Sequence, residues 1–171
     1  MIPLENLRVL HRPRVSRSAS SEVFIRGSFH VETCQRDLWI YSEDSSELSP
    51  PPILGLELYR GADAYLFLLQ VATGLQSEIR GETDIFGQIK ASWAQFESSS
   101  ELQWWMQRLF EDTKEIRARY IQNGGGSSYG SLVRMLLKQK QAGPEEPILL
   151  VGAGLLALSI LPWIDDHELW L

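Results

Sequence analysis

The hydrophobic pattern of this chain changes its period near Gly61, and that change limits the possible folds more than any other feature. Before it, residues 7–10 and 23–31 are short runs whose composition suits strands, and a serine-rich turn at residues 16–21 lies between them. After it, apolar residues recur every three or four positions, as in amphipathic helices. Strands followed by helices predict an α+β domain in which a small sheet packs against helices.

The second predicted strand leads toward the only cysteine of the chain. If that strand continues to Cys34, its period of two divides the side chains between two faces. Residues 39–41 would continue the sheet, and residues 42–52, which include three consecutive prolines, would form a surface loop. The two faces of the strand would carry His30, Glu32 and Cys34 on one side and Phe29, Val31 and Thr33 on the other.

Four helices are predicted after Gly61. The second has a candidate capping residue, Thr83. The third spans about residues 101–120, its cations lie mostly on a solvated face, and three glycines end it. A fourth begins at Ser127 or Ser128 and reaches about residue 139. The apolar faces are Ala62, Tyr65, Leu66, Leu69 and Ala72 in the first helix, Phe86, Ile89, Trp93 and Phe96 in the second, and Leu102, Trp105, Met106, Leu109, Phe110, Ile116 and Tyr120 in the third, whose cations are Arg108, Lys114, Arg117 and Arg119.

The composition changes abruptly after a polar linker at residues 141–146. The apolar run at residues 147–151 predicts a strand, a glycine-rich turn follows it, and residues 168–171 predict another strand. A Gly-x-Gly-x-x-Ala turn between strand and helix lets the backbone approach a pyrophosphate, although a tightly packed turn needs glycine too. We therefore expect a truncated Rossmann-type βαβ unit, whose turn consists of Gly152, Ala153, Gly154, Leu155, Leu156 and Ala157.

These patterns divide the chain into a catalytic or substrate-binding domain at residues 1–98, connecting helices at 99–143 and a truncated dinucleotide-binding segment at 144–171. Of the 171 residues, 44% are hydrophobic and 22% charged, which is typical of soluble globular proteins. A single cysteine precludes an internal disulfide and suits a reducing compartment. No signal peptide or bilayer-spanning run is visible, so we expect a cytoplasmic protein.

The net charge of −6 argues against general affinity for nucleic acid. Four arginines nevertheless lie within ten residues that also contain His11 and no acidic residue. Such a patch could contact phosphates, or it could be a solvated arm. The arginines are Arg8, Arg12, Arg14 and Arg17.

Cys34 follows a threonine and precedes Arg36 by two positions. The thiolate is the attacking form of cysteine, and a neighbouring cation increases the thiolate fraction at neutral pH. Arg36 could equally hold a substrate carboxylate. A lone cysteine is more often a small buried apolar residue, so this motif needs support from the rest of the chain.

Several stretches together resemble one family, glutamyl-tRNA reductase, the first enzyme of the five-carbon route to tetrapyrroles. Thr33-Cys34-Gln35-Arg36 looks like the Thr-Cys-Asn-Arg nucleophile motif of that family. Residues 58–59, 64–67, 71–77 and 81–90 follow its longest conserved block, in the same order. Residues 109–119 and 151–154 fall where the family has its connecting helices and its NADPH domain.

The resemblance implies a reaction. In the family, the cysteine attacks the aminoacyl ester of glutamyl-tRNA, and hydride from NADPH reduces the resulting thioester to glutamate-1-semialdehyde. Cys34 would be the nucleophile of an NADPH-dependent oxidoreductase that acts on glutamyl-tRNA, with no membrane partner and with a homodimer only if a longer chain exists. The rest of the substrate pocket would be Thr33, Gln35, Arg36, Ser77, Glu82, Thr83, Asp84 and Gln88, and residues 152–157 would begin an NADPH site that is incomplete in this chain.

The chain departs from the family pattern at several positions. Tyr65 matches the histidine that assists catalysis, so the resemblance makes it the second catalytic residue beside Cys34. A phenol, however, cannot act as a base near pH 7 unless its pKa is far from about 10. Thr83-Asp84 replaces Pro-Gln and adds a negative charge to a pocket for an acidic amino acid. Gln35 replaces the asparagine, and Leu38 replaces a glutamate. Most of the NADPH domain and the dimerisation helices of the family are missing.

Three functions are therefore considered. The chain could be a divergent or truncated reductase, with impaired or incomplete activity. It could be a non-catalytic homologue that binds tRNA or a partner protein and keeps Cys34 by inheritance. It could also be a separate thiol enzyme with His30 as base, although the strand spacing places His30 and Cys34 about 13 Å apart, which is too far for proton transfer.

Overall fold

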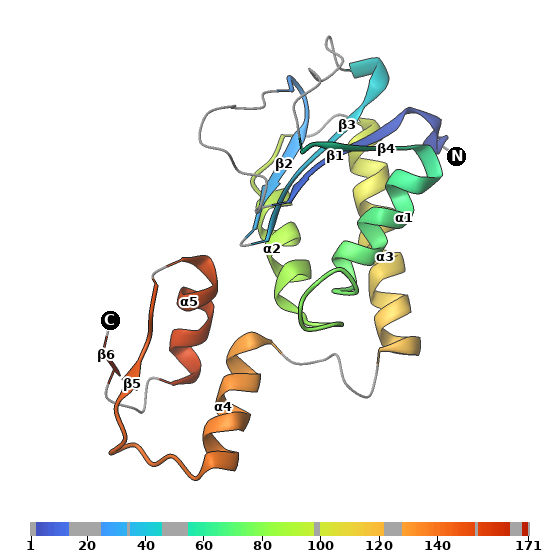
Figure 1. The fold of residues 1–171 in the computed structure, drawn as a ribbon. Coiled ribbons are helices and arrows are strands. Elements are labelled where there is room, and N and C mark those ends of the chain that lie inside the picture. Colours follow the sequence, from blue (N-terminus) through green and yellow to red (C-terminus); the bar gives the residue numbers. More distant parts are fainter. Residues whose placement is uncertain are drawn as a thin grey trace.

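The computed structural model describes residues 3–13, 25–33, 35–45, 55–97, 100–121, 128–152, 154–164 and 169–170. Cys34, Ala153, Arg14 and Arg17 lie outside these ranges. In the described part of the chain, the main sheet has four strands. Figure 1 shows helices against one face of this sheet and a smaller C-terminal part after them. The elements are β1 (Leu7–Pro13), β2 (Phe29–Glu32), β3 (Arg36–Ser42), β4 (Glu57–Arg60), α1 (Gly61–Ala72), α2 (Asp84–Trp93), α3 (Ser100–Tyr120), α4 (Tyr129–Lys140), β5 (Ile148–Leu149), α5 (Leu155–Ile160) and β6 (Leu169–Trp170), with short 3-10 turns at η1 (Leu4–Asn6), η3 (Glu43–Ser45) and η4 (Leu161–Trp163).

The sheet has the strand order β2-β3-β1-β4, and all its neighbours are antiparallel. In β2, Phe29 and Val31 are buried while His30 and Glu32 are exposed, which confirms the predicted period of two. The strand is shorter than predicted, because residues 25–28 form a turn and residues 23–24 lie outside the described part. The strand β4, which the sequence analysis did not predict, pairs with β1 at the opposite edge of the sheet.

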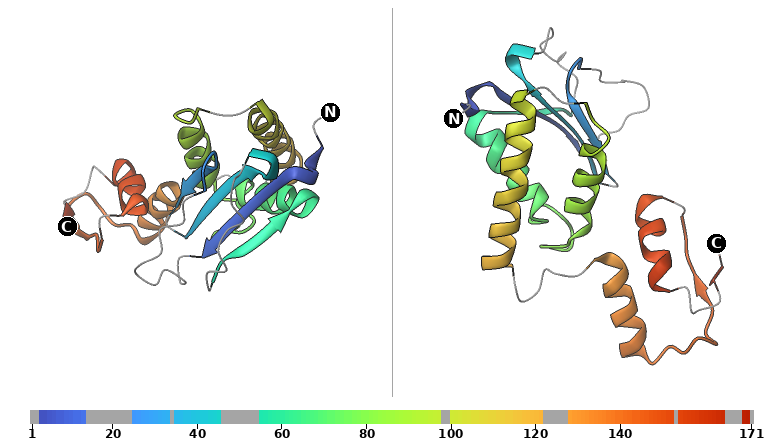
Figure 2. Two further views of the ribbon diagram at one scale, coloured as in Figure 1. Left: turned by 90° about the horizontal axis from the view of Figure 1, so that it is seen from above. Right: turned by 180° about the vertical axis from the view of Figure 1, so that it is seen from behind.

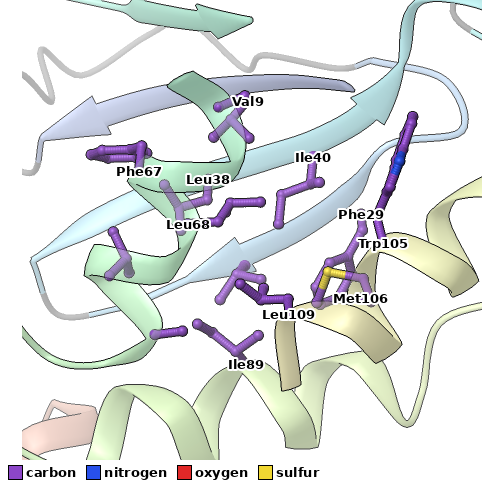
Figure 3. Packing of buried hydrophobic residues seen from close by; sticks show 14 of the residues in the cluster. Val9, Phe29, Leu38, Ile40, Phe67, Leu68, Ile89, Trp105, Met106 and Leu109 are labelled. Carbon is purple, nitrogen blue, oxygen red and sulfur yellow. The ribbon is translucent and has the colours of Figure 1, made fainter. Parts of the chain in front are cut away.

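Helices α1, α2 and α3 cover one face of the sheet and enclose the main core (Figures 1 and 2). Leu38 and Ile40 of β3 meet Leu68 of α1 and Ile89 of α2 in this core (Figure 3). Met106 of α3 closes it and is fully buried. A second, smaller cluster on the other face of the sheet contains Leu10, Ile25, Trp39 and Tyr41. The predicted α+β class, a small sheet packed against helices, is thus confirmed.

The inward face of α1 differs from the predicted one. The buried residues are Ala64, Phe67, Leu68, Val71 and Ala72, whereas Leu66 is 54% exposed. Apolar residues surround most of this helix, so two different stripes fit the helical period and the periodicity alone cannot select one. In α3 the predicted stripe is correct at Leu102 and Leu109 but fails at Tyr120, which is 77% exposed at the end of the helix.

The C-terminal part lies beside the start of α2, where Asp84 accepts a hydrogen bond from the Tyr129 N–H (Figures 1 and 2). Ser128 caps α4 as predicted, since its side chain accepts a hydrogen bond from the Ser131 N–H. The helix packs on α5 and η4, and Gly130 lies so close to the Trp163 ring that a Cβ atom would come within 2.0 Å of it. The strands β5 and β6 are parallel, with α5 between them in the chain. Among the described residues, no helix is both long and apolar enough to cross a membrane.

Candidate functional site

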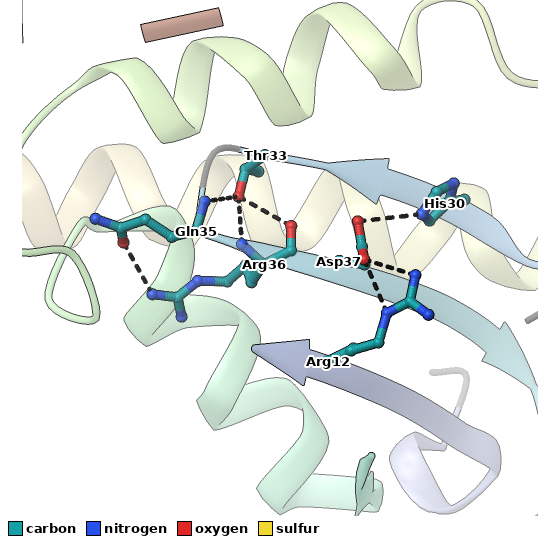
Figure 4. A network of polar contacts seen from close by, with 6 residues as sticks. All are labelled: Arg12, His30, Thr33, Gln35, Arg36 and Asp37. Carbon is teal, nitrogen blue, oxygen red and sulfur yellow. Dashed lines mark hydrogen bonds and ion pairs between the residues drawn. The ribbon is translucent and has the colours of Figure 1, made fainter. Parts of the chain in front are cut away.

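The hairpin between β2 and β3 is closed by the hydrogen bonds of Thr33. Its N–H donates to the Arg36 carbonyl oxygen (2.9 Å), and its hydroxyl donates to the same oxygen (3.0 Å). The Thr33 Oγ1 also accepts from the N–H groups of Gln35 (3.2 Å) and Arg36 (3.0 Å), as Figure 4 shows. Only residues 34 and 35 connect the pair in sequence. Thr33 therefore holds the hairpin closed, and the nucleophile predicted from the sequence, Cys34, lies outside the described residues.

Arg36 connects this hairpin to the loop that follows α1. Its side chain is buried, and its Nη2 donates to the Gln35 Oε1 (3.3 Å) and to the carbonyl oxygen of Gln76. Two segments that are 40 residues apart are thus joined by one guanidinium group. Five fixed donors make arginine suitable for holding carbonyl and carboxylate oxygens together.

Glu82 organises the start of α2. Its buried carboxylate accepts from the Ser77 hydroxyl (3.0 Å) and from the N–H groups of Asp84 and Ile85, the latter at 3.2 Å. The predicted capping residue, Thr83, does occupy the N-cap position, but its side chain makes no capping hydrogen bond. The prediction of a Thr83 cap is therefore wrong, because the longer Glu82 side chain reaches the free amides and brings a charge favourable to the helix N-terminus.

These side chains meet at one small cavity of about 20 Å³. All of the predicted substrate-binding residues except Thr83 line it. Two residues that the sequence analysis did not place in the pocket, Ile85 and Tyr129, line it as well, and so does Leu156, which had been assigned to the cofactor turn. The complete lining is Thr33, Gln35, Arg36, Ser77, Glu82, Asp84, Ile85, Gln88, Tyr129 and Leu156.

Asp84 contacts the first residue of α4. Its Oδ2 accepts from the Tyr129 N–H at 3.0 Å. The N-terminus of a helix carries a partial positive charge, which offsets a carboxylate placed there. The N-terminus of α4 thus partly compensates the negative charge of Asp84, which was expected to oppose an acidic substrate. No pattern in the sequence around Tyr129 indicated this contact.

The structure does not bring Tyr65 to these residues. Tyr65 lines a separate cavity of about 520 Å³ between η1, α1 and α3. Its hydroxyl donates to the Asp112 Oδ2 (2.8 Å), and burial together with this carboxylate raises the pKa of Tyr65 far above its usual value. The cavity is lined by Pro3, Leu4, Glu5, Gly61, Ala62, Tyr65, Trp104, Arg108 and Asp112.

His11, which the sequence analysis assigned to a basic patch, is instead a buried residue of the sheet. Its Nδ1 lies 3.0 Å from the Glu57 Oε2, and its ring packs against Phe67 with 5.0 Å between centroids. Burial lowers the pKa of His11 more than the hydrogen bond to Glu57 raises it, and the positive charge of Arg36 lowers it further. The same hydrogen bond from His11, with that from Tyr59, lowers the pKa of Glu57. Glu57 lies on β4, a strand that was not predicted, so no sequence pattern indicated the pair of His11 and Glu57.

The arginines of the predicted basic patch that can be described are bound within the domain. Arg8 is paired with Glu43, and Arg12 donates to the Asp37 Oδ2 from Nε (3.0 Å) and Nη2 (2.9 Å). Asp37 is 1% exposed and also lies 3.8 Å from the His30 Nε2 (Figure 4). Neither Arg8 nor Arg12 therefore belongs to a solvated arm.

The predicted cofactor turn retains room around its glycines. Gly152 has a φ of +107°, and a Cβ atom at Gly152 or Gly154 would meet nothing within 4 Å. These features fit the close approach of a pyrophosphate. The following helix, α5, has only six residues, and the cofactor role of residues 152–157 stays a prediction. The described His, Cys, Asp and Glu side chains form no group of three or more that could hold a metal ion.

The fold and the cavity together define an α+β domain with helices on one face of its main sheet and a polar cavity where the β2–β3 hairpin meets α2. A sequence model described as the N-terminal domain of glutamyl-tRNA(Glu) reductase matches residues 8–122. The chain therefore belongs to the glutamyl-tRNA reductase family.

Individual relatives agree with this assignment. The chain is 32% identical over 155 residues to the glutamyl-tRNA reductase of Xanthomonas campestris pv. campestris (strain B100). The matched region covers 83% of this chain and 36% of that protein. It is 33% identical over 164 residues to that of Xanthomonas campestris pv. phaseoli. The glutamyl-tRNA reductase structure from Methanopyrus kandleri has the same fold, with a TM-score of 0.61 and 20% identity over 96% of this chain and 48% of that one. The chain spans about a third of the length of these curated relatives.

Proposed function

We propose that this chain carries the part of a glutamyl-tRNA reductase that binds the glutamyl group and forms the thioester. The observation that carries the proposal is the convergence of three separate segments on one cavity. The hairpin contributes Arg36, the loop after α1 contributes Ser77, and α2 contributes Gln88. The resemblance to the family assigns all three to one substrate pocket, and they are far apart in the chain.

In the proposed reaction the Cys34 thiolate attacks the ester carbonyl carbon of glutamyl-tRNA. A carbon–sulfur bond forms, the bond to the ribose oxygen breaks, and that oxygen takes up a proton as it leaves. Arg36 would hold a carboxylate of the glutamyl group, since its guanidinium stays charged at physiological pH. Tyr65 lies in the other cavity and is assigned no step in this transfer.

NADPH, when bound, would supply the hydride that reduces the thioester to glutamate-1-semialdehyde, the first step of tetrapyrrole biosynthesis. Gly152 and Gly154 would receive its pyrophosphate, since both glycines leave open space around the backbone. Two short parallel strands cannot enclose a dinucleotide. We therefore assign thioester formation to this chain and expect the isolated chain to lack the complete reductase activity.

One observation favours a second function. A cavity of about 20 Å³ holds roughly one water molecule, and a glutamyl group does not fit in it. If Tyr129 and Leu156 do not move away, the chain is a non-catalytic homologue that binds tRNA or a partner protein. If they move, the cavity opens toward the substrate.

Single-turnover deacylation of glutamyl-tRNA distinguishes the two functions. We expect the wild type to release tRNA faster than buffer does and to acquire the mass of a glutamyl group on Cys34. Cys34→Ser should lose both effects, and Glu78→Gln, an exposed change in the loop after α1, should retain them. If the wild type, Cys34→Ser and buffer behave alike while the chain binds tRNA in a titration, the non-catalytic function is correct.

A further inference from the structure

The loop between α1 and α2, residues 73–83, is closed at its neck by backbone contacts. The Gly81 N–H donates to the Gly74 carbonyl oxygen (2.9 Å). Gly74 has a φ of +79°, and a Cβ atom there would lie 2.6 Å from the Glu82 carbonyl oxygen. The two ends of the loop therefore touch at a point where only glycine fits.

Arg117 of α3 joins the same two ends. Its Nη1 donates to the carbonyl oxygens of Thr73 (2.8 Å) and Glu82 (2.9 Å), and its Nη2 donates to that of Gly81 (2.9 Å). One acceptor is on the incoming end of the loop and two are on the outgoing end. Helical periodicity predicts Arg117 on a solvated face of α3. This prediction is wrong, because the Arg117 guanidinium binds three backbone carbonyl oxygens.

The closed loop presents two groups to the candidate site. The carbonyl oxygen of Gln76 accepts from Arg36, and Ser77 lines the cavity and donates to Glu82. Hydrogen bonds from a charged donor are roughly twice as strong as neutral ones, and the planar guanidinium fixes their directions. A lysine at this position carries a single ammonium group and cannot reproduce the fork that spans both ends.

We propose that Arg117 is a positioning residue of the substrate cavity, which acts by closing the loop that holds Ser77 and the Gln76 carbonyl in place. The inference deepens the proposed function and rests on it for the effect on activity. The effect of Arg117 on the loop is independent of the proposed function, because it can be measured without substrate. Arg119 supplies a matched control on the same helix, since it is exposed and pairs with Glu115 (2.9 Å).

Amide hydrogen exchange tests the loop directly in the wild type, Arg117→Lys and Arg119→Lys. We expect Arg117→Lys to accelerate exchange about tenfold or more at Ser77 and Gly81, whose N–H groups both donate to the Gly74 carbonyl oxygen within this loop. Exchange in β1 and β3 should stay unchanged, and Arg119→Lys should match the wild type everywhere. Unchanged loop exchange in Arg117→Lys, or equal acceleration in the loop and the sheet, would overturn the inference.

Deacylation kinetics and chemical rescue test the consequence for the site. In single-turnover deacylation, we expect Arg117→Lys to lower the rate at low protein concentration about tenfold, mainly by raising the protein concentration that gives the half-maximal rate, while Arg119→Lys changes neither this concentration nor the maximal rate. Guanidinium ion at concentrations below those that denature should restore part of the loss in Arg117→Ala, and sodium ion should not. A slower single-turnover deacylation without any rescue would show a role in stability alone and overturn the inference. An inactive wild type would refute the proposed function, and hydrogen exchange would then decide on Arg117.

Discussion

Replacing Glu82 with alanine should destabilise the domain more than any other single change in the loop that does not involve glycine. The carboxylate is buried and accepts from the Ser77 hydroxyl and from the N–H groups of Asp84 and Ile85. Loss of a helix cap costs about 1 kcal/mol, and loss of a negative charge at a helix N-terminus costs about 0.3–1 kcal/mol. The half-buried Ser77 hydroxyl, which loses its acceptor, adds about 1 kcal/mol. Glu82→Ala should therefore lower the free energy of unfolding by about 2–4 kcal/mol.

Urea denaturation followed by tryptophan fluorescence measures this loss. With a slope of about 2 kcal/mol per M for a domain of this size, the midpoint should fall by about 1–2 M. Glu82→Gln keeps one acceptor oxygen for the helix amides and should lose about half as much. Glu78→Ala, an exposed change in the same loop, should stay within about 0.5 kcal/mol of the wild type. A Glu82→Ala midpoint that matches the Glu78→Ala midpoint would refute the assignment of Glu82 as the cap of α2.

Four further predictions concern the backbone, pH, the cofactor and Tyr65. Gly74→Ala should lower the free energy of unfolding, measured by urea denaturation, by about 2 kcal/mol or more, since it combines a positive φ with a Cβ atom 2.6 Å from a carbonyl oxygen. Burial lowers the pKa of His11 below 6.5, so the stability that neutral His11 contributes is present above pH 6.5 and is lost as the pH falls through its folded-state pKa. His11→Gln should flatten the decline in stability below pH 6.5, measured by urea denaturation at several pH values, and an equally steep decline would contradict the assignment. NADPH should not quench the tryptophan fluorescence of the isolated chain in a saturable way, and tight binding would show that the two short strands suffice. Tyr65→Phe should leave the rate of glutamyl-tRNA deacylation unchanged, and a large loss would return Tyr65 to the catalytic site.

The α+β class could be predicted because it depends on local signals, whereas the residues of the candidate pocket came from the resemblance to glutamyl-tRNA reductases. The change of period at Gly61 is visible in the sequence, and so is the motif at residues 33–36, whereas the hairpin there was not predicted. The pocket residues came from motifs that keep their order along the chain. The alternation of β2 followed from the strand period alone, and Phe29 and Val31 are indeed buried.

The errors arise where a tertiary contact selects among local possibilities. Two apolar stripes fit α1, and packing against the sheet buried Phe67 rather than Leu66. Sequence similarity predicts Tyr65 in the catalytic site. Because α1 buries the face with Phe67 and Leu68, Tyr65 lies instead in the cavity beside α3. Helical periodicity places Arg117 on the polar face of α3. Its hydrogen bonds to the loop after α1 follow only from the tertiary structure.

The contacts between β2 and β3 constrain the length of the connection from Thr33 to Arg36 more strictly than the residue types within it. Thr33 and Arg36 pair directly, and β3 continues with Leu38 toward the helices and Trp39 toward the opposite face. One added residue would have to widen the loop, which breaks the Thr33–Arg36 pair, or shift the register, which turns Leu38 away from the core. Redesign of this motif is therefore confined to substitutions made one for one, and insertion or deletion between β2 and β3 should be tolerated far less than any exchange at position 35.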